Sequence, residues 1–370
     1  MDDRSASAAI DARIDAWVER TRAMTGSEAW EREVWNREAS ADAIRQFVYG
    51  TDDDNPLWRD PAYAARTRAG GVLAPPGFLV SVLYPILHGA PMAAPLTSLI
   101  GGLEYEWFRP IRLGDRLEAR PVQKDFYEKR NKQGRRLNFV ISEVTYTNQR
   151  GETVAVATGT MIMATQAGSE LLFDRPVKHY SEAEIAALDA AFERETRTGA
   201  RPFAFEDVRV GDKLPPMVRG PLTIGDLVSY YAGAGPSWKA GRWGRLDLKK
   251  KPHAQIPHPV LGLPAPYGLK HLDQHLAVAG GMPAPFDVGV MRFATVAPLL
   301  TDWMGDDGFL KKLYVQVAKP VIYGDTVTYG GTVSALDAAA GVATLEIEGL
   351  NQLGEVTTKG RGEVRLPRRA

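Results

Sequence analysis

The chain lacks cysteine altogether among its 370 residues. This absence excludes disulfide bonds, thiolate catalysis, Cys-based zinc sites and thioether-linked haem. Net charge is lacking too, because 45 basic side chains balance 45 acidic ones, so the chain as a whole has no attraction to nucleic acid. No apolar run approaches the roughly 20 residues of a membrane span, and the acidic start does not follow a signal-peptide pattern. We therefore expect a cytoplasmic protein that binds neither membranes nor nucleic acid.

One sequence pattern occurs twice. FRPIRLGDRLEARP at 108–121 is echoed by AKPVIYGDTVTYGG at 318–331, and TYTNQRGETVAVATGTMIM at 145–163 is echoed by GLNQLGEVTTKGRGEVRL at 349–366. The prolines of the first pair are 320 − 110 = 210 residues apart, and the asparagines of the second are 351 − 148 = 203 apart, so order and spacing are kept. Such an echo predicts two related units. We place them at 1–165 and 204–370, with a linker at 166–203.

The local patterns predict an α+β fold. Alternating apolar and polar residues around the echoes predict half-buried antiparallel strands. Upstream of each sheet, residues 75–87 and 289–305 are apolar on all sides, which predicts two buried helices interrupted near Pro85 and Pro298. A capping box predicts a linker helix at 181–196. An amphipathic helix at the start of the chain is expected to pack on the first unit or to form an oligomer contact.

The repeated pattern, together with TDDDNPLWRDPAYAARTRAGGVLAPPGFL in the first half and HLDQHLA and DVGVM in the second, resembles the MaoC-like hydratase/dehydratase family. Its first half is similar to the FAS1-like, non-catalytic dehydratase domain of that group. The resemblance implies a double hotdog, with two buried helices each wrapped by an antiparallel sheet, and an acyl thioester as substrate. In this family an Asp-x-Asn-Pro-(Ile/Leu)-His-x-Asp motif supplies a catalytic Asp and His, and a later His-Gly-Met supplies a backbone N–H to the thioester oxygen.

The first half carries most of this motif, in Asp53, Asn55, Pro56 and Asp60, but Trp58 stands in the place of the histidine. An indole has no basic lone pair with which to accept a proton. We therefore expect the first half to be inert as a hydratase and to bind the acyl chain or complete the pseudo-dimer, with Trp58 contributing to packing or to the binding of the acyl chain. The alternative is that Asp53 and Asn55 only cap the turn before the buried helix.

The second half keeps the histidine. His271 and Asp273 match the family's His-x-Asp, and Gly289 follows His271 by 18 residues, the spacing that the family leads one to expect. The resemblance makes His271 the acid/base and makes Gly289 the source of the N–H that binds the oxyanion, a role suited to a residue without Cβ at a helix start. Pro266 stands in the place of the catalytic Asp. Asp287 is the first candidate for the missing partner, and Asp273 the second.

His275 raises the question of a metal site, because it lies four residues after His271, as two ligands on one helical face would. HLDQH lacks the Glu of the metalloprotease motif, and no third ligand is marked. We therefore expect His275 to lie on a helix surface. We expect no metal, and no cofactor beyond the coenzyme A of the substrate.

The segment WKAGRWGRLDLKKKPHAQIPH at 238–258 contains six basic residues and one acidic one between Lys239 and Lys251. It interrupts the family pattern and therefore predicts an inserted loop. As a cover over the site, this loop would bring basic groups to the phosphates of coenzyme A; these are Arg245, Lys249, Lys250 and Lys251. A solvated basic loop is the alternative.

These expectations favour an enoyl-CoA hydratase, or in reverse an (R)-3-hydroxyacyl-CoA dehydratase, with the (R) configuration implied by the resemblance alone. A non-catalytic acyl-thioester-binding or scaffold subunit is the first alternative, favoured by Pro266. A thioesterase is the second, because hotdog folds also host that chemistry. A homodimer of double-hotdog chains is compatible with the sequence.

Overall fold

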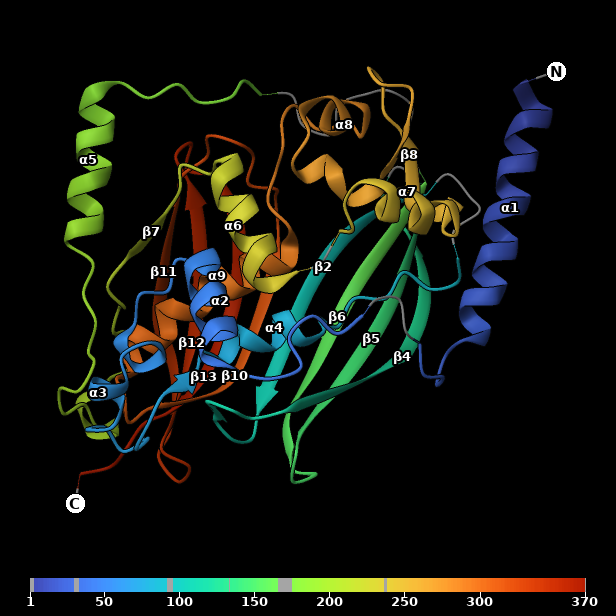
Figure 1. Cartoon of the computed structure of the whole chain (residues 1–370). Coiled ribbons are helices and arrows are strands. Elements are labelled where there is room, and N and C mark those ends of the chain that lie inside the picture. Colours follow the sequence, from blue (N-terminus) through green and yellow to red (C-terminus); the bar gives the residue numbers. More distant parts are fainter. Residues whose placement is uncertain are drawn as a thin grey trace.

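A single antiparallel sheet runs through both halves of the chain in the computed structural model, which describes residues 3–29, 33–91, 96–132, 134–165, 175–235 and 238–369 (Figure 1). Its nine strands follow the order β4-β5-β6-β2-β10-β13-β12-β11-β7. Strand β2 of the first half pairs with β10 of the second, from Gly102 opposite Gln316 to Glu106 opposite Lys312. The expected double hotdog is confirmed.

The strands of this sheet are β2 (Leu96–Trp107), β4 (Leu117–Arg130), β5 (Arg136–Asn148), β6 (Thr153–Thr165), β7 (Met217–Arg219), β10 (Phe309–Val317), β11 (Val327–Asp337), β12 (Val342–Asn351) and β13 (Val356–Arg365). Two short pairs lie outside it, β1 (Leu73–Ala74) with β3 (Ile111–Arg112) and β8 (Gln255–Pro257) with β9 (Pro264–Pro266). The helices are α1 (Asp3–Ala23), α2 (Ala41–Thr51), α3 (Pro61–Ala64), α4 (Leu79–Val82), α5 (Glu182–Glu193), α6 (Ile224–Ala234), α7 (Gly241–Lys249), α8 (Gln274–Ala279) and α9 (Gly289–Met304). The 3-10 helices are η1 (Pro56–Trp58), η2 (Pro76–Phe78), η3 (Phe205–Asp207), η4 (Pro252–Ala254) and η5 (Tyr267–His271). None of these helices is long and apolar enough to span a bilayer.

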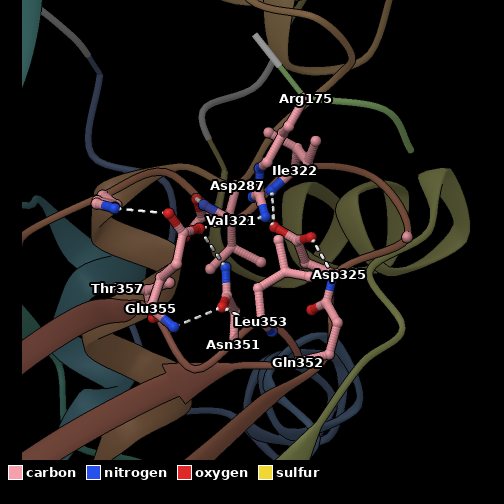
Figure 2. A network of polar contacts seen from close by, with 12 residues as sticks. Arg175, Asp287, Val321, Ile322, Asp325, Asn351, Gln352, Leu353, Glu355 and Thr357 are labelled. Atoms are coloured by element: carbon pink, nitrogen blue, oxygen red, sulfur yellow. Dashed lines mark hydrogen bonds and ion pairs between the residues drawn. The ribbon is translucent and has the colours of Figure 1, made fainter. Parts of the chain in front are cut away.

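The echoed residues make the same contacts in both units. In the second, Asp325 accepts a hydrogen bond from the Ile322 N–H at 2.8 Å and another from the side-chain amide of Gln352 at 2.8 Å (Figure 2). Asp115 of the first unit accepts the matching bonds, from the Arg112 N–H at 2.8 Å and from Gln149 at 3.0 Å. The repeat in the sequence is therefore a repeat in the structure.

Helix α9 is the expected buried helix of the second unit. Twelve of its 16 residues are buried, so it is covered on all sides. Figure 1 shows it in front of the sheet, beside α2, α4 and α6. Gly77 of the first unit lies against α9, since a Cβ there would be 3.6 Å from the Cα of Ala294, an ordinary van der Waals distance.

The corresponding helix of the first unit is much shorter than the predicted 75–87. It consists of η2 and α4 and ends at Val82, because Leu83 is extended, with φ −161°. Pro85 explains this ending, since a proline disfavours the helical conformation in the residue before it and has no N–H to donate. The carbonyl groups released from the helix accept hydrogen bonds from the sheet, Leu83 from Tyr146 and Pro85 from Ser142.

The inserted segment also differs from the expectation. Residues 241–249 form helix α7, followed by the small β8–β9 hairpin, where we expected a loop. Two further expectations hold: α1 packs on the first unit through buried Ile14, Trp17 and Val18, and α5 begins with the capping box of Ser181 and Glu184. Part of the proposed linker, residues 166–174, lies outside the described residues.

Candidate active site

His271 ends helix η5 and lies against the segment that leads into α9. Its Nδ1 is 3.0 Å from the carbonyl oxygen of Phe286, and its ring lies 4.2 Å from the Phe286 ring, between centroids. A carbonyl oxygen can only accept, so Nδ1 must carry the proton of the neutral ring. The lone pair of the neutral imidazole therefore lies on Nε2.

The surroundings keep His271 neutral. Burial lowers its pKa, the positive charge of Lys270 lowers it further, and hydrogen bonding to the main chain at Phe286 and Asp287 offsets only part of this, which leaves a pKa of about 4. A neutral imidazole at neutral pH is a proton acceptor. His271 is thus in the form that a general base requires.

Gly289 begins α9 three residues after Phe286, the residue that His271 contacts. The residue before it, Val288, occupies the N-cap position and provides no side-chain acceptor. The first N–H groups of a helix have no acceptor within the helix, so the start of α9 can donate to a negatively charged oxygen. Gly289 also meets the other half of the protein, since a Cβ there would lie 2.9 Å from the Cβ of Ile100 in β2.

Asp287 lies two residues before this helix, but its carboxylate is held by arginine. Arg292 donates to both oxygens, at 2.6 and 2.8 Å, and the Val321 N–H donates to one of them at 3.0 Å (Figure 2 labels Asp287 and Val321). Both oxygens of Asp287 are therefore already engaged by Arg292. The catalytic role of Asp287 stays a prediction, and this geometry favours a structural role.

Tyr267 and Lys270 belong to the same 3-10 helix as His271 and were missed by the sequence reasoning. The ammonium of the buried Lys270 donates to the Tyr267 hydroxyl at 2.9 Å and lies 4.0 Å from the centroid of its ring. The Tyr267 hydroxyl is also 3.4 Å from the Thr97 hydroxyl of β2. The available signal was a Tyr and a Lys three residues apart, directly before the motif histidine.

Asp273 is a helix cap. It precedes α8 and accepts from the N–H groups of His275 and Leu276, just as Asp60 caps α3 in the first half. His271 and His275 therefore lie in two different helices, and the single helical face on which two metal ligands would sit does not form. His275 is exposed. Among the described residues, no three or more His, Asp or Glu side chains form a group suited to a metal.

The basic segment borders the site through β9, which ends one residue before Tyr267. Arg245 of α7 lies 3.4 Å from the carbonyl oxygen of Pro264 in β9. Lys249, Lys250 and Lys251 are exposed at the end of α7, where Lys251 donates to Asp247 at 3.1 Å. Figure 1 shows α7 and α8 together above the upper end of β2.

Trp58 lies at the other end of α9. Its indole N–H donates to both oxygens of the buried Asp53, at 3.0 Å each, and Asn55 of the same motif donates to Asp302 at 3.3 Å. Asp302 is thirteen residues after Gly289 along the helix, which corresponds to about 20 Å. A role for Trp58 in acyl binding stays a prediction, and its buried, bonded indole favours a packing role.

A cavity of about 730 Å³ lies between α2, α6, α9 and β11. Asp287 and Arg292 reach it from the site side. Its lining contains seven acidic residues, Asp52, Asp54, Glu195, Asp226, Asp287, Asp302 and Asp325, and three basic ones, Arg197, Arg219 and Arg292. The excess of carboxylates makes this cavity unsuited to phosphate groups.

Comparison with known proteins finds relatives of this chain. The family model "FAS1-like, dehydratase domain region" matches residues 23–157. The chain is 30% identical over 131 residues to a UPF0336 protein of Saccharopolyspora erythraea, an alignment that covers 34% of this chain and 80% of the relative. It is 32% identical over 88 residues to the 3-oxo-4,17-pregnadiene-20-carboxyl-CoA hydratase beta subunit of Mycobacterium tuberculosis, covering 24% of this chain and 67% of the relative.

Solved structures agree with this result. One described as a MaoC-like dehydratase has a TM-score of 0.63 and 18% identity, with 94% of this chain and 99% of that chain covered. The chain belongs to the UPF0336 family, and it has the fold of that MaoC-like structure. A Mycobacterium tuberculosis protein described as a double hotdog shares the fold of this chain, with a TM-score of 0.54, 13% identity, and coverage of 92% of this chain and 96% of that one. The chain spans 57% of the length of another UPF0336 relative, from Streptomyces avermitilis, to which it is 27% identical over 85 residues, or 22% of this chain.

Proposed function

We propose that this MaoC-like chain hydrates 2-enoyl-CoA thioesters, and dehydrates 3-hydroxyacyl-CoA thioesters in reverse, at the His271 site of the second unit. The observation that carries the proposal is the fixed, neutral His271. Its Nδ1–H is held by the Phe286 carbonyl next to the start of α9, and its Nε2 carries the lone pair. We infer that this base and the N–H groups at the start of α9, as oxyanion donors, act on one substrate, as the chemistry requires.

In the proposed reaction, His271 Nε2 takes a proton from water while the water oxygen bonds to the β-carbon. The electrons of the double bond move toward the thioester oxygen, and the N–H groups at the start of α9 stabilise the negative charge that develops there. The α-carbon then receives a proton from an acid. The reaction needs no cofactor apart from the coenzyme A of the substrate, and the (R) configuration follows from the family resemblance.

The charge distribution supports a location for coenzyme A. The cavity beside Asp287 has seven acidic residues and three basic ones in its lining, which disfavours phosphate. Helix α7 instead places exposed cations next to β9, which leads directly into the helix of His271. We infer that the phosphates bind at α7 and that the thioester points toward Gly289.

The test is the hydration of crotonyl-CoA and of longer or branched enoyl-CoA thioesters, followed by the loss of enone absorbance. His271→Ala removes the base and should lower the rate by roughly 100-fold or more, with unfolding unchanged. His275→Ala is the matched control, since His275 is exposed on the neighbouring helix. Full turnover by His271→Ala would exclude this site as the seat of hydration.

A non-catalytic acyl-thioester-binding protein is the second candidate, favoured by two observations. Pro266 stands where the family has its catalytic Asp, and both oxygens of Asp287 are engaged by Arg292. The same assay separates the alternatives, because hydration removes the enone absorbance, hydrolysis releases a free thiol, and a binding protein does neither.

A further inference from the structure

The site contains a second ionisable group that the family motif does not account for. Tyr267 and Lys270 lie on the helix that ends with His271, and Lys270 is buried, with an exposed fraction of 8%. The lysine ammonium both donates to the Tyr267 hydroxyl and lies over its ring. A buried ammonium is costly unless it stabilises a nearby polar or negatively charged group. Here that group is the phenol oxygen.

Strand β2 of the other half fixes the position of this phenol relative to the start of α9. The Tyr267 hydroxyl lies 3.4 Å from the Thr97 hydroxyl, while Gly289 packs against Ile100 of the same strand. Thr97 and Ile100 are three residues apart, a separation of about 10 Å along the strand. The phenol and the start of α9 therefore border the same stretch of β2.

We propose that Tyr267 is the general acid of this site, which protonates the α-carbon of the enoyl thioester, and that Lys270 is its positioning residue. This role rests on the proposed hydratase function. Tyr267 would act as the partner of His271 in place of the family's Asp, which this chain replaces with Pro266. Tyr267 is the next residue along the chain.

The positive charge of Lys270 lowers the pKa values of both Tyr267 and His271. Burial would raise the pKa of Tyr267, but the charge of Lys270 and the hydrogen bonds to the phenol outweigh it and lower the pKa to about 8. The pKa of His271 is lowered by burial and then by the same lysine, to about 4. The remaining charge that faces His271 is Asp287, which is paired with Arg292. At pH 6 to 7 the phenol is therefore protonated and the imidazole neutral, which is the acid and the base that hydration requires.

The step balances without another reactant. Water gives one proton to His271 Nε2, and its oxygen forms the bond to the β-carbon. The Tyr267 O–H breaks and its proton forms the new C–H bond at the α-carbon. After the step, His271 is an imidazolium with one extra proton and Tyr267 is a tyrosinate that lacks one. Transfer of this proton from His271 to Tyr267 through solvent restores the site.

The experiment is the pH–rate profile of crotonyl-CoA hydration by the full chain, for the wild type, Tyr267→Phe, Lys270→Met and Lys270→Arg. The wild-type rate should fall above pH 8. Tyr267→Phe should lower the plateau rate by roughly 100-fold and abolish this fall. Lys270→Met should move both limbs of the profile to higher pH, because the lysine lowers both pKa values, and Lys270→Arg should restore most of the wild-type profile. A merely structural lysine would change the rate without moving the limbs.

The first unit offers a matched control pair. Lys129 lies 5.1 Å above the ring centroid of Tyr127 on β4. Tyr127→Phe and Lys129→Met should leave rate and profile unchanged. If the wild type hydrates the substrate and Tyr267→Phe keeps its rate and its fall above pH 8, the role of Tyr267 is wrong and the hydratase function stands. If the folded wild type hydrates no enoyl-CoA, both the function and the role fail.

Discussion

Asp53 keeps the carboxylate of the family motif, but its partner is the indole of Trp58. The side chain is 4% exposed, and it accepts from the indole N–H through both oxygens. Burial raises the pKa of Asp53, the negative charge of Asp302 raises it further, and the hydrogen bonds from Asn55 and Trp58 offset only part of this, so that the pKa is about 7. Asp53 is therefore a buried acid that keeps its proton at a higher pH than a solvent-exposed carboxyl would.

This carboxyl should make stability depend on pH. Its pKa is higher in the folded chain than in the unfolded chain, so the folded state holds the extra proton, and stability is lost as the pH rises toward 7. Asp53→Asn removes this loss. From pH 5 to pH 8 the variant should gain on the order of 2–3 kcal/mol relative to the wild type. Urea unfolding of both proteins at the two pH values measures the difference, and a gap that does not change with pH would contradict the prediction.

Residue identity was enough to propose part of the candidate site. The spacing in the sequence pointed to His271 and Gly289, and the structure places His271 against Phe286, three residues before Gly289; their catalytic roles stay predictions. It did not reveal Tyr267, because the importance of this residue depends on Lys270 and on Thr97, a residue of the other half. The sequence spacing also did not predict the ion pair between Arg292 and Asp287. This pair forms because the first turn of α9 places Arg292 beside the carboxylate.

At the scale of elements, apolar composition predicted both central helices but not their lengths. Residues 289–304 form the expected helix, which runs on through Pro298. Residues 75–87 form only a short helix, because from Leu83 on the carbonyl groups of Leu83 and Pro85 bond to the sheet. Both prolines were visible in the sequence. What differed was the neighbouring sheet, where Gly159 of β6 leaves room for the Pro85 carbonyl.

Helix α7 carries an element-scale prediction. Its end presents Lys249, Lys250 and Lys251 to solvent, in a chain without net charge. Changing all three to Ala should weaken coenzyme A binding by roughly tenfold and flatten its dependence on salt, because fewer charges meet the phosphates. Calorimetric titration at several salt concentrations measures both effects.

A control variant removes three positive charges from another surface, on β13. Lys359, Arg361 and Arg365 are exposed on one face of β13, while the alternate residues of that strand are buried. Their change to Ala should leave binding of coenzyme A unaltered. Equal affinity of the α7 variant and the wild type would show that the basic segment is only solvated surface.

For the whole molecule, the repeated sequence predicted two units, and the structure shows how they depend on one another. The sheet is continuous only because β2 pairs with β10. Helices α2 and α6, one from each half, cross where glycines allow contact, since a Cβ at Gly50 would lie 2.5 Å from the Ser229 carbonyl oxygen. One cluster of buried side chains includes residues of both halves, from Ile14 to Leu366. The repeated pattern in the sequence predicts that there are two units. It does not predict how the two units pack together, because that depends on their mutual orientation.

The shared core leads to the last prediction, that neither half is a stable monomer. In an isolated 1–165 fragment, β2 would become an edge strand of 12 residues, and in an isolated 204–370 fragment the apolar α9 would lose its contacts with the first unit. Long unpaired edges and exposed apolar surface favour aggregation or new pairing. We expect each fragment alone to aggregate or to pair with a second copy, and the two fragments expressed together to form a 1:1 complex. Size-exclusion chromatography and thermal unfolding would test this, with the full chain as the reference. A fragment that remains monomeric and unfolds cooperatively would show that its unit is independently stable, and that the β2–β10 junction only joins two finished domains.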